Sequence, residues 1–133
     1  MSKLLIHFLP TILGNVNFVL HPAEVSSLDS MTIPIGRRLF QGPYLSADSL
    51  EDRSGVYAIL DQRRDGKYYV IDIGESKAVK TRVESHDRAN CWTKNQMGIL
   101  AVAVFYTPHQ QQAGRTAIEQ ELRSQYSPVC GIR

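Results

Sequence analysis

The chain has 133 residues and a mass of 15.0 kDa, the size of a single domain, and 43% of its residues are hydrophobic and 21% charged. This balance excludes a largely disordered chain, which would carry too few apolar residues to bury a core. A formal net charge of +2 excludes an overall basic field of the kind that marks many nucleic-acid-binding proteins. Cys91 and Cys130 match no zinc spacing and are too few for a disulfide scaffold. We therefore expect two buried free thiols in a soluble, cytoplasmic protein.

Residues 4–20 contain an apolar run that follows Lys3 and loosely resembles a signal peptide. Pro10 and Gly14 interrupt the run, and it lacks the roughly 20 consecutive apolar residues that a membrane-spanning helix needs. We therefore expect an edge strand or a docking arm and no membrane partner.

The first 50 residues are weakly patterned, and we interpret them as an N-terminal extension that packs on a core domain of residues 51–133. Residues 16–20 and 36–40 have the composition of short strands within this extension.

The core domain begins with two segments rich in β-branched and aromatic side chains, residues 55–61 and 68–74. Asp65 and Gly66 between them are a strong turn signal, so the two segments predict a β-hairpin. A helix is expected to follow over residues 77–88, with Ser76 as its N-cap.

Residues 98–107 form a continuous apolar run that predicts a central strand covered on both faces. The composition of residues 111–126 favours a helix, which Pro128 would end. The buried stripe of this helix is expected to comprise Ile118, Leu122 and Tyr126. The order hairpin, helix, strand, helix predicts an α+β fold, with a three-stranded mixed sheet flanked by helices.

Polar residues on these elements have a spacing that resembles the GIY-YIG nuclease family. The tripeptides GVY at residues 55–57 and DIG at residues 72–74 stand where the family has its two signature tripeptides, and Arg82 follows the second glycine by eight residues. His86 comes four residues after Arg82, and Glu119 on the last helix precedes Pro128 by nine residues. The resemblance covers roughly residues 54–131 and implies a small GIY-YIG-like domain.

Two positions depart from the family pattern. Asp72 stands in place of the second signature tyrosine, and Gly131 in place of a late asparagine. Strand alternation puts Tyr68, Val70 and Asp72 on one face, where Tyr68 is too far along the strand to replace the missing ring. Asp72 is either a second carboxylate near a metal ion or a strand-end aspartate held by the backbone or by Arg82.

The resemblance implies a metal-dependent endonuclease that hydrolyses DNA phosphodiester bonds. Its catalytic residues would be Tyr57, Arg82, His86 and Glu119. Glu119, with Asp72 as a candidate second ligand, would hold Mg²⁺ or Mn²⁺, since hard cations prefer carboxylate oxygen. Arg82 would clamp phosphate oxygens, Tyr57 would act as or position the general base, and His86 would hydrogen-bond to Tyr57 or relay a proton.

DNA binding would depend on local charge, because residues 77–94 carry a net charge of +3 within a chain of only +2. The candidate nucleic-acid-binding residues are Lys77, Lys80, Arg88, Lys94, Trp92, Arg63 and Arg64.

Plainer interpretations remain open for individual residues. Arg82 and His86 could lie on a solvated helix face, and Glu119 could form ordinary ion pairs with Arg115 and Arg123 four residues away. Trp92 could be a packing residue. For the whole domain, the alternatives are a degenerate member that binds nucleic acid without cutting and a protein-interaction module on the same fold.

Overall fold

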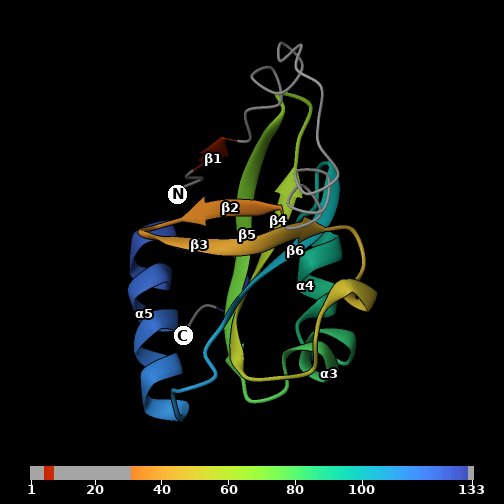
Figure 1. The fold of residues 1–133 in the computed structure, drawn as a ribbon. Coiled ribbons are helices and arrows are strands. Elements are labelled where there is room, and N and C mark those ends of the chain that lie inside the picture. The colour runs from red at the N-terminus through yellow and green to blue at the C-terminus, as the bar shows by residue number, and fades with distance from the viewer. Residues whose placement is uncertain (1–4, 8–30, 132–133) are drawn as a thin grey trace, which may run out of the picture.

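The structure is a computed structural model that describes residues 5–7 and 31–131 (Figure 1). The strands are β1 (Leu5–His7), β2 (Thr32–Ile35), β3 (Arg38–Tyr44), β4 (Gly55–Gln62), β5 (Lys67–Ser76) and β6 (Ile99–Tyr106). The helices are α3 (Val79–Glu84), α4 (Ala89–Asn95) and α5 (Gln112–Tyr126), with the short 3₁₀ helix η1 (Ala47–Ser49) before β4. Figure 1 shows α5 on one side of the sheet and α3 and α4 on the other.

The sheet corrects the predicted three-stranded mixed arrangement. Its strand order is β1-β5-β4-β6-β3-β2, and every neighbouring pair is antiparallel. Strands β2 to β6 form a curled five-stranded sheet, and the three-residue β1 pairs along its outer edge. The chain passes from β5 through two helices to the far side of β4, so β6 pairs antiparallel with β4 and no parallel neighbour arises. The α+β class is correct.

Three local predictions from the sequence are confirmed. Strands β4 and β5 form the expected hairpin, with Gly66 at φ +80° in its turn. Strand β6 is central, because it lies between β4 and β3. Helix α5 covers the predicted last helix and ends at Tyr126.

The single helix predicted over residues 77–88 is wrong. Helix α3 ends at Glu84, and Ser85, with φ −125° and ψ 39°, leaves helical geometry before α4 begins at Ala89. His86 therefore lies in the turn between two short helices, not one turn beyond Arg82 on the same helix. Ser76 is not the N-cap, although its hydroxyl accepts a hydrogen bond from the Ala78 N–H at 3.0 Å.

The sheet separates two buried clusters. The cluster under α5 includes the predicted stripe of Ile118, Leu122 and Tyr126. The cluster under α3 and α4 includes Tyr57, Ile59, Ile71, Val79 and Trp92.

A β-bulge in the β4–β5 ladder overturns the predicted strand alternation. Ile59 pairs with Asp72 but Leu60 pairs with Val70, so β5 carries an extra residue at this point. Tyr68 and Val70 belong to the cluster under α5, whereas Asp72 contacts Trp92 on the opposite side of the sheet. The bulge thus directs Asp72 towards α4.

The N-terminal part contributes to the sheet itself. Ile33, Ile35 and Phe40 on β2 and β3 are fully buried in the core under α5, and Gly36 lies in the turn between these strands rather than in a strand. The possible strand at residues 16–20, and residues 4–20 apart from β1, lie outside the described residues. In the described part of the chain, no helix has the length and apolar character needed to cross a membrane.

Candidate functional site

The centre of the candidate site is a hydrogen bond between Tyr57 and His86. The Tyr57 Oη atom lies 2.5 Å from His86 Nε2 beneath α3 and α4. Tyr57 pairs in register with Gly74, and a Cβ atom at Gly74 would overlap the tyrosine hydroxyl. The glycine of the DIG tripeptide is therefore required for Tyr57 to cross β5 and reach His86.

The hydrogen bonds of His86 define the tautomer of its ring. The backbone N–H of Arg88 donates to Nδ1 at 2.9 Å, so Nδ1 carries no proton in the neutral ring. The proton is then on Nε2, which donates to Tyr57 Oη. The Trp92 ring packs against the imidazole with its centroid 4.7 Å away.

Burial makes both members of this pair neutral near pH 7. Burial lowers the pKa of His86 to about 4, and the positive charges of Arg82 and Arg88 act in the same direction. Burial also raises the pKa of Tyr57 to about 12, with a further increase from the negative charge of Asp72 and opposing effects from Arg88 and Arg82.

Arg82 lies beside this pair on the solvent side. Tyr57 and His86 are only 1% and 7% exposed, whereas the Arg82 side chain is 38% exposed. The Arg82 guanidinium forms an ion pair with Asp87 at 2.9 Å, and the Asp87 carboxylate also lies 3.2 Å from His86 Nδ1. A phosphate that approached this cluster would meet Arg82 first and would compete with Asp87 for it.

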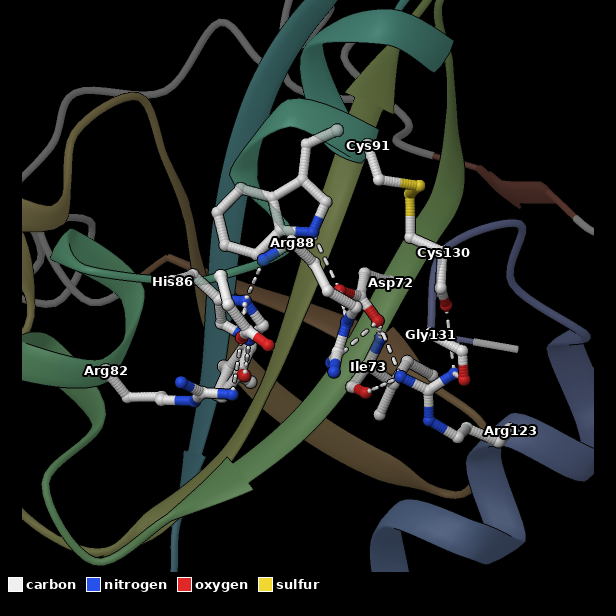
Figure 2. Close-up of polar contacts among 12 residues, drawn as sticks. Asp72, Ile73, Arg82, His86, Arg88, Cys91, Arg123, Cys130 and Gly131 are labelled. Atoms are coloured by element: carbon white, nitrogen blue, oxygen red, sulfur yellow. Dashed lines mark hydrogen bonds and ion pairs between the residues drawn. A yellow bond between two sulfur atoms is a disulfide. The ribbon is translucent and has the colours of Figure 1, made fainter. Parts of the chain in front are cut away.

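Asp72 is the most highly coordinated side chain of the region (Figure 2). It is fully buried, and its carboxylate accepts two hydrogen bonds from Arg88, one from Arg123, one from Trp92 Nε1 and one from the Ile73 N–H. Asp72 is therefore held by the backbone and by arginines, as one of the two interpretations expected. The arginines are Arg88 and Arg123, however, and not Arg82.

Glu119 lies on α5, whose buried face packs in the cluster on the opposite side of the sheet from the cluster that contains Tyr57. Its carboxylate is 3.6 Å from Arg123 Nε, and Arg123 in turn reaches Asp72 and the Ile73 carbonyl. The other expected partner, Arg115, pairs with Glu75 at 2.8 Å. Across residues 5–7 and 31–131, no three His, Cys, Asp or Glu side chains form a group that could hold a metal ion.

The candidate nucleic-acid-binding residues are in different environments. Lys77, Lys94 and Arg64 are exposed, and Lys80 is half-buried. Arg88 and Trp92 both contact Asp72, and the Trp92 ring is in the core, as its plainer interpretation expected. Arg63 pairs with Asp61 at 2.9 Å and stacks over Tyr69 at the hairpin tip, at the opposite end of β4 and β5 from α3.

The two cysteines form a disulfide, so the prediction of free thiols is wrong. The segment after α5 returns along β5, where the Cys130 N–H donates to the Ile71 carbonyl at 3.0 Å. This return brings Cys130 against Cys91 on α4, 39 residues away in sequence. Arg123 also donates to the Cys130 and Gly131 carbonyls, so the disulfide adjoins the Asp72 network (Figure 2).

Sequence reasoning missed three contributors to the site. The role of the Arg88 backbone has no sequence signal, because any residue except proline could supply that N–H. Asp87 and Arg123 carried only a weak signal, as charged residues close in sequence to His86 and Glu119.

Comparisons with known proteins find no matching family model, no matching curated protein and no matching solved structure. A proposal for function therefore depends on the geometry of Tyr57, Arg82 and His86 and on the spacing of the motifs that contain them.

Proposed function

We propose that the chain is a metal-dependent endonuclease that hydrolyses DNA phosphodiester bonds at the cluster of Tyr57, Arg82 and His86. The observation that carries this proposal is the 2.5 Å contact between Tyr57 Oη and His86 Nε2, with the Arg82 guanidinium beside it. The spacing of these residues, which resembles that of the GIY-YIG family, supports it.

Arg82 would bind the phosphate. Its planar guanidinium can donate two parallel hydrogen bonds to phosphate oxygens, and the anionic phosphate would replace Asp87 as its partner. Because the Arg82 side chain is partly exposed, it is accessible to DNA before any rearrangement of the buried pair.

Tyr57 would accept the proton of the attacking water. The phenolate is the basic form, and the Nε2–H of His86 and the charge of Arg82 both stabilise it. The water oxygen then forms its bond to phosphorus as the bond to the 3′ oxygen breaks. The products are a 5′ phosphate and a 3′ alkoxide, which takes a proton from solvent to become the 3′ hydroxyl. Because the pKa of Tyr57 is about 12, its phenolate is a strong base, but only a small fraction of Tyr57 is in that form at neutral pH.

A divalent cation fits one of the two carboxylates that the sequence suggested. Asp72 does not fit, because five hydrogen bonds already occupy its oxygens. Glu119 fits by donor type, since Mg²⁺ is commonly held by one or two carboxylates together with waters, but it is buried and lies 3.6 Å from Arg123 Nε, so a bound ion would have to replace that arginine as its partner. When bound, such an ion would neutralise charge on the phosphate and lower the pKa of a bound water.

The proposal is tested by incubating the purified protein with supercoiled and branched DNA, in Mg²⁺, in Mn²⁺ and in chelator. Arg82→Ala and Glu119→Ala are compared with matched controls, Arg37→Ala and Glu121→Ala, whose residues pair with each other at the protein surface. We expect metal-dependent nicking that falls at least 100-fold in the first two variants and persists in the controls.

The burial of Tyr57, at 1% exposure, is the observation that favours the alternative of binding without cutting. Salt-sensitive DNA binding by a wild-type protein that never nicks would refute the nuclease and support that alternative. Absence of DNA binding at low salt would instead support a protein-interaction module.

A further inference from the structure

Asp72 occupies a position that only the bulge in β5 makes available. Without the extra residue, strand alternation would place its side chain with Tyr68 and Val70 under α5. With it, the carboxylate lies under α4 and is fully buried. A buried carboxylate is costly unless it is fully paired, and the five hydrogen bonds described above provide that pairing.

Two of the residues anchored on Asp72 also contact His86. The Arg88 guanidinium binds the carboxylate through Nε at 2.8 Å and a terminal nitrogen at 3.2 Å, and the N–H of the same residue donates to His86 Nδ1. Trp92 donates its indole N–H to Asp72 at 2.7 Å and packs its ring against the imidazole. Figure 2 shows His86 and Asp72 on either side of Arg88.

We propose that Asp72 is a positioning residue for His86. By anchoring Arg88 and Trp92, it holds the imidazole in one orientation and one tautomer, with Nε2–H directed at Tyr57. The consequence for DNA cleavage rests on the proposed function, whereas the orientation of His86 does not. The proposal differs from a purely structural ion pair, which would contribute to stability without affecting the imidazole.

One neighbour of His86 opposes this tautomer. The Asp87 carboxylate, 3.2 Å from Nδ1, would favour a proton on that nitrogen. The Arg88 N–H must therefore be kept in place for Nδ1 to remain an acceptor, and the side-chain anchor on Asp72 provides this restraint. Loss of the anchor should allow the Nδ1–H tautomer to form.

The test is ¹⁵N NMR of histidine-labelled protein at pH 7, which distinguishes protonated from unprotonated ring nitrogens. In the wild type, we expect Nδ1 of His86 to be unprotonated and Nε2 to be protonated, with slow exchange of its proton with water. Arg88→Ala and Asp72→Asn should each produce a mixture of tautomers and at least tenfold faster exchange of that proton. Trp92→Phe keeps a ring but removes the indole N–H, and we expect a smaller change in the same direction.

The matched control is Asp61→Asn. Asp61 is likewise a fully buried strand aspartate paired with an arginine, and it accepts hydrogen bonds from the Met97 and Gly98 N–H groups away from His86. We expect this variant to lose stability without altering the His86 resonances.

Unchanged His86 resonances in Arg88→Ala would overturn the proposal. If Asp72→Asn does not fold, Arg88→Ala decides the question, because the Arg88 side chain is partly exposed and its removal should disturb the fold less. If the wild type cleaves DNA, Asp72→Asn should lower kcat at least tenfold with KM unchanged, since a fully buried side chain does not contact DNA. If it does not cleave, the NMR result still decides the role of Asp72, so failure of this inference and failure of the proposed function are distinguishable.

Discussion

Acid pH should destabilise this protein through His86. The pKa of His86 is lowered from 6.5 to about 4 in the folded chain, chiefly by burial, so the unfolded chain binds a proton more readily. The stabilisation is fully present above pH 6.5 and is lost as the pH falls towards 4. A pKa difference of this size corresponds to about 3 kcal/mol in total, of which about 2 kcal/mol is lost by pH 5.

The measurement is urea unfolding of the wild type, His86→Gln and His109→Gln at pH 8 and pH 5. His109 is exposed on the loop after β6, so its replacement is a matched control. Between the two pH values, the wild type and His109→Gln should lose about 2 kcal/mol more unfolding free energy than His86→Gln. Equal losses in all three proteins would refute the assignment of a buried, neutral His86.

Three further predictions concern the site and its surroundings. Gly74→Ala should displace Tyr57, because the new Cβ atom would overlap the tyrosine hydroxyl, and should destabilise the fold by about 1–3 kcal/mol and abolish nicking. The control is Gly66→Ala at the open hairpin turn, which should leave nicking unchanged. Cys130→Ser should lower the unfolding free energy measured in urea by about 4 kcal/mol, because the disulfide closes a loop over a separation of 39 residues. Reductant should lower the stability of the wild type and leave that of the variant unchanged. The nicking rate should increase about tenfold per pH unit from pH 6 to 9, because the fraction of Tyr57 in the phenolate form rises tenfold per unit below its pKa of about 12. A plateau within that range would exclude the phenolate of Tyr57 as the base.

The sequence predicted the elements whose signals are local. Asp65 and Gly66 specify the turn between β4 and β5, and the apolar run of β6 identifies a central strand. The stripe of Ile118, Leu122 and Tyr126 identifies the buried face of α5. Each signal lies within one element or between two adjacent ones, so neighbouring residues suffice to reveal it.

The sheet could not be predicted in full, because its remaining strands depend on distant partners. Strand β2 contains Pro34, which is unfavourable within a sheet, and it is tolerated here at an outer edge. Strand β3 completes the sheet only by pairing with β6, whose residues lie about 60 positions later in the chain.

The candidate site also has a part that the sequence predicted and a part that it could not predict. Motif spacing identified Tyr57, Arg82 and His86, and the structure brings these three together. Motif spacing could not reveal that the helix breaks at Ser85, which places His86 in a turn. Nor could it reveal that Glu119 lies on a helix that packs on the opposite side of the sheet from Tyr57.

By itself, the sequence determined an α+β domain with a hairpin, a central strand and an amphipathic last helix, because these follow from periodicity and turn chemistry. Only the tertiary structure decided the surroundings of Asp72, whose partners Arg88, Trp92 and Arg123 are 16, 20 and 51 residues away. Only it decided that Cys91 and Cys130 pair. The physical reason is that a buried charge must gather hydrogen-bond donors from whichever elements the fold brings to it, and local sequence patterns do not record which elements those are.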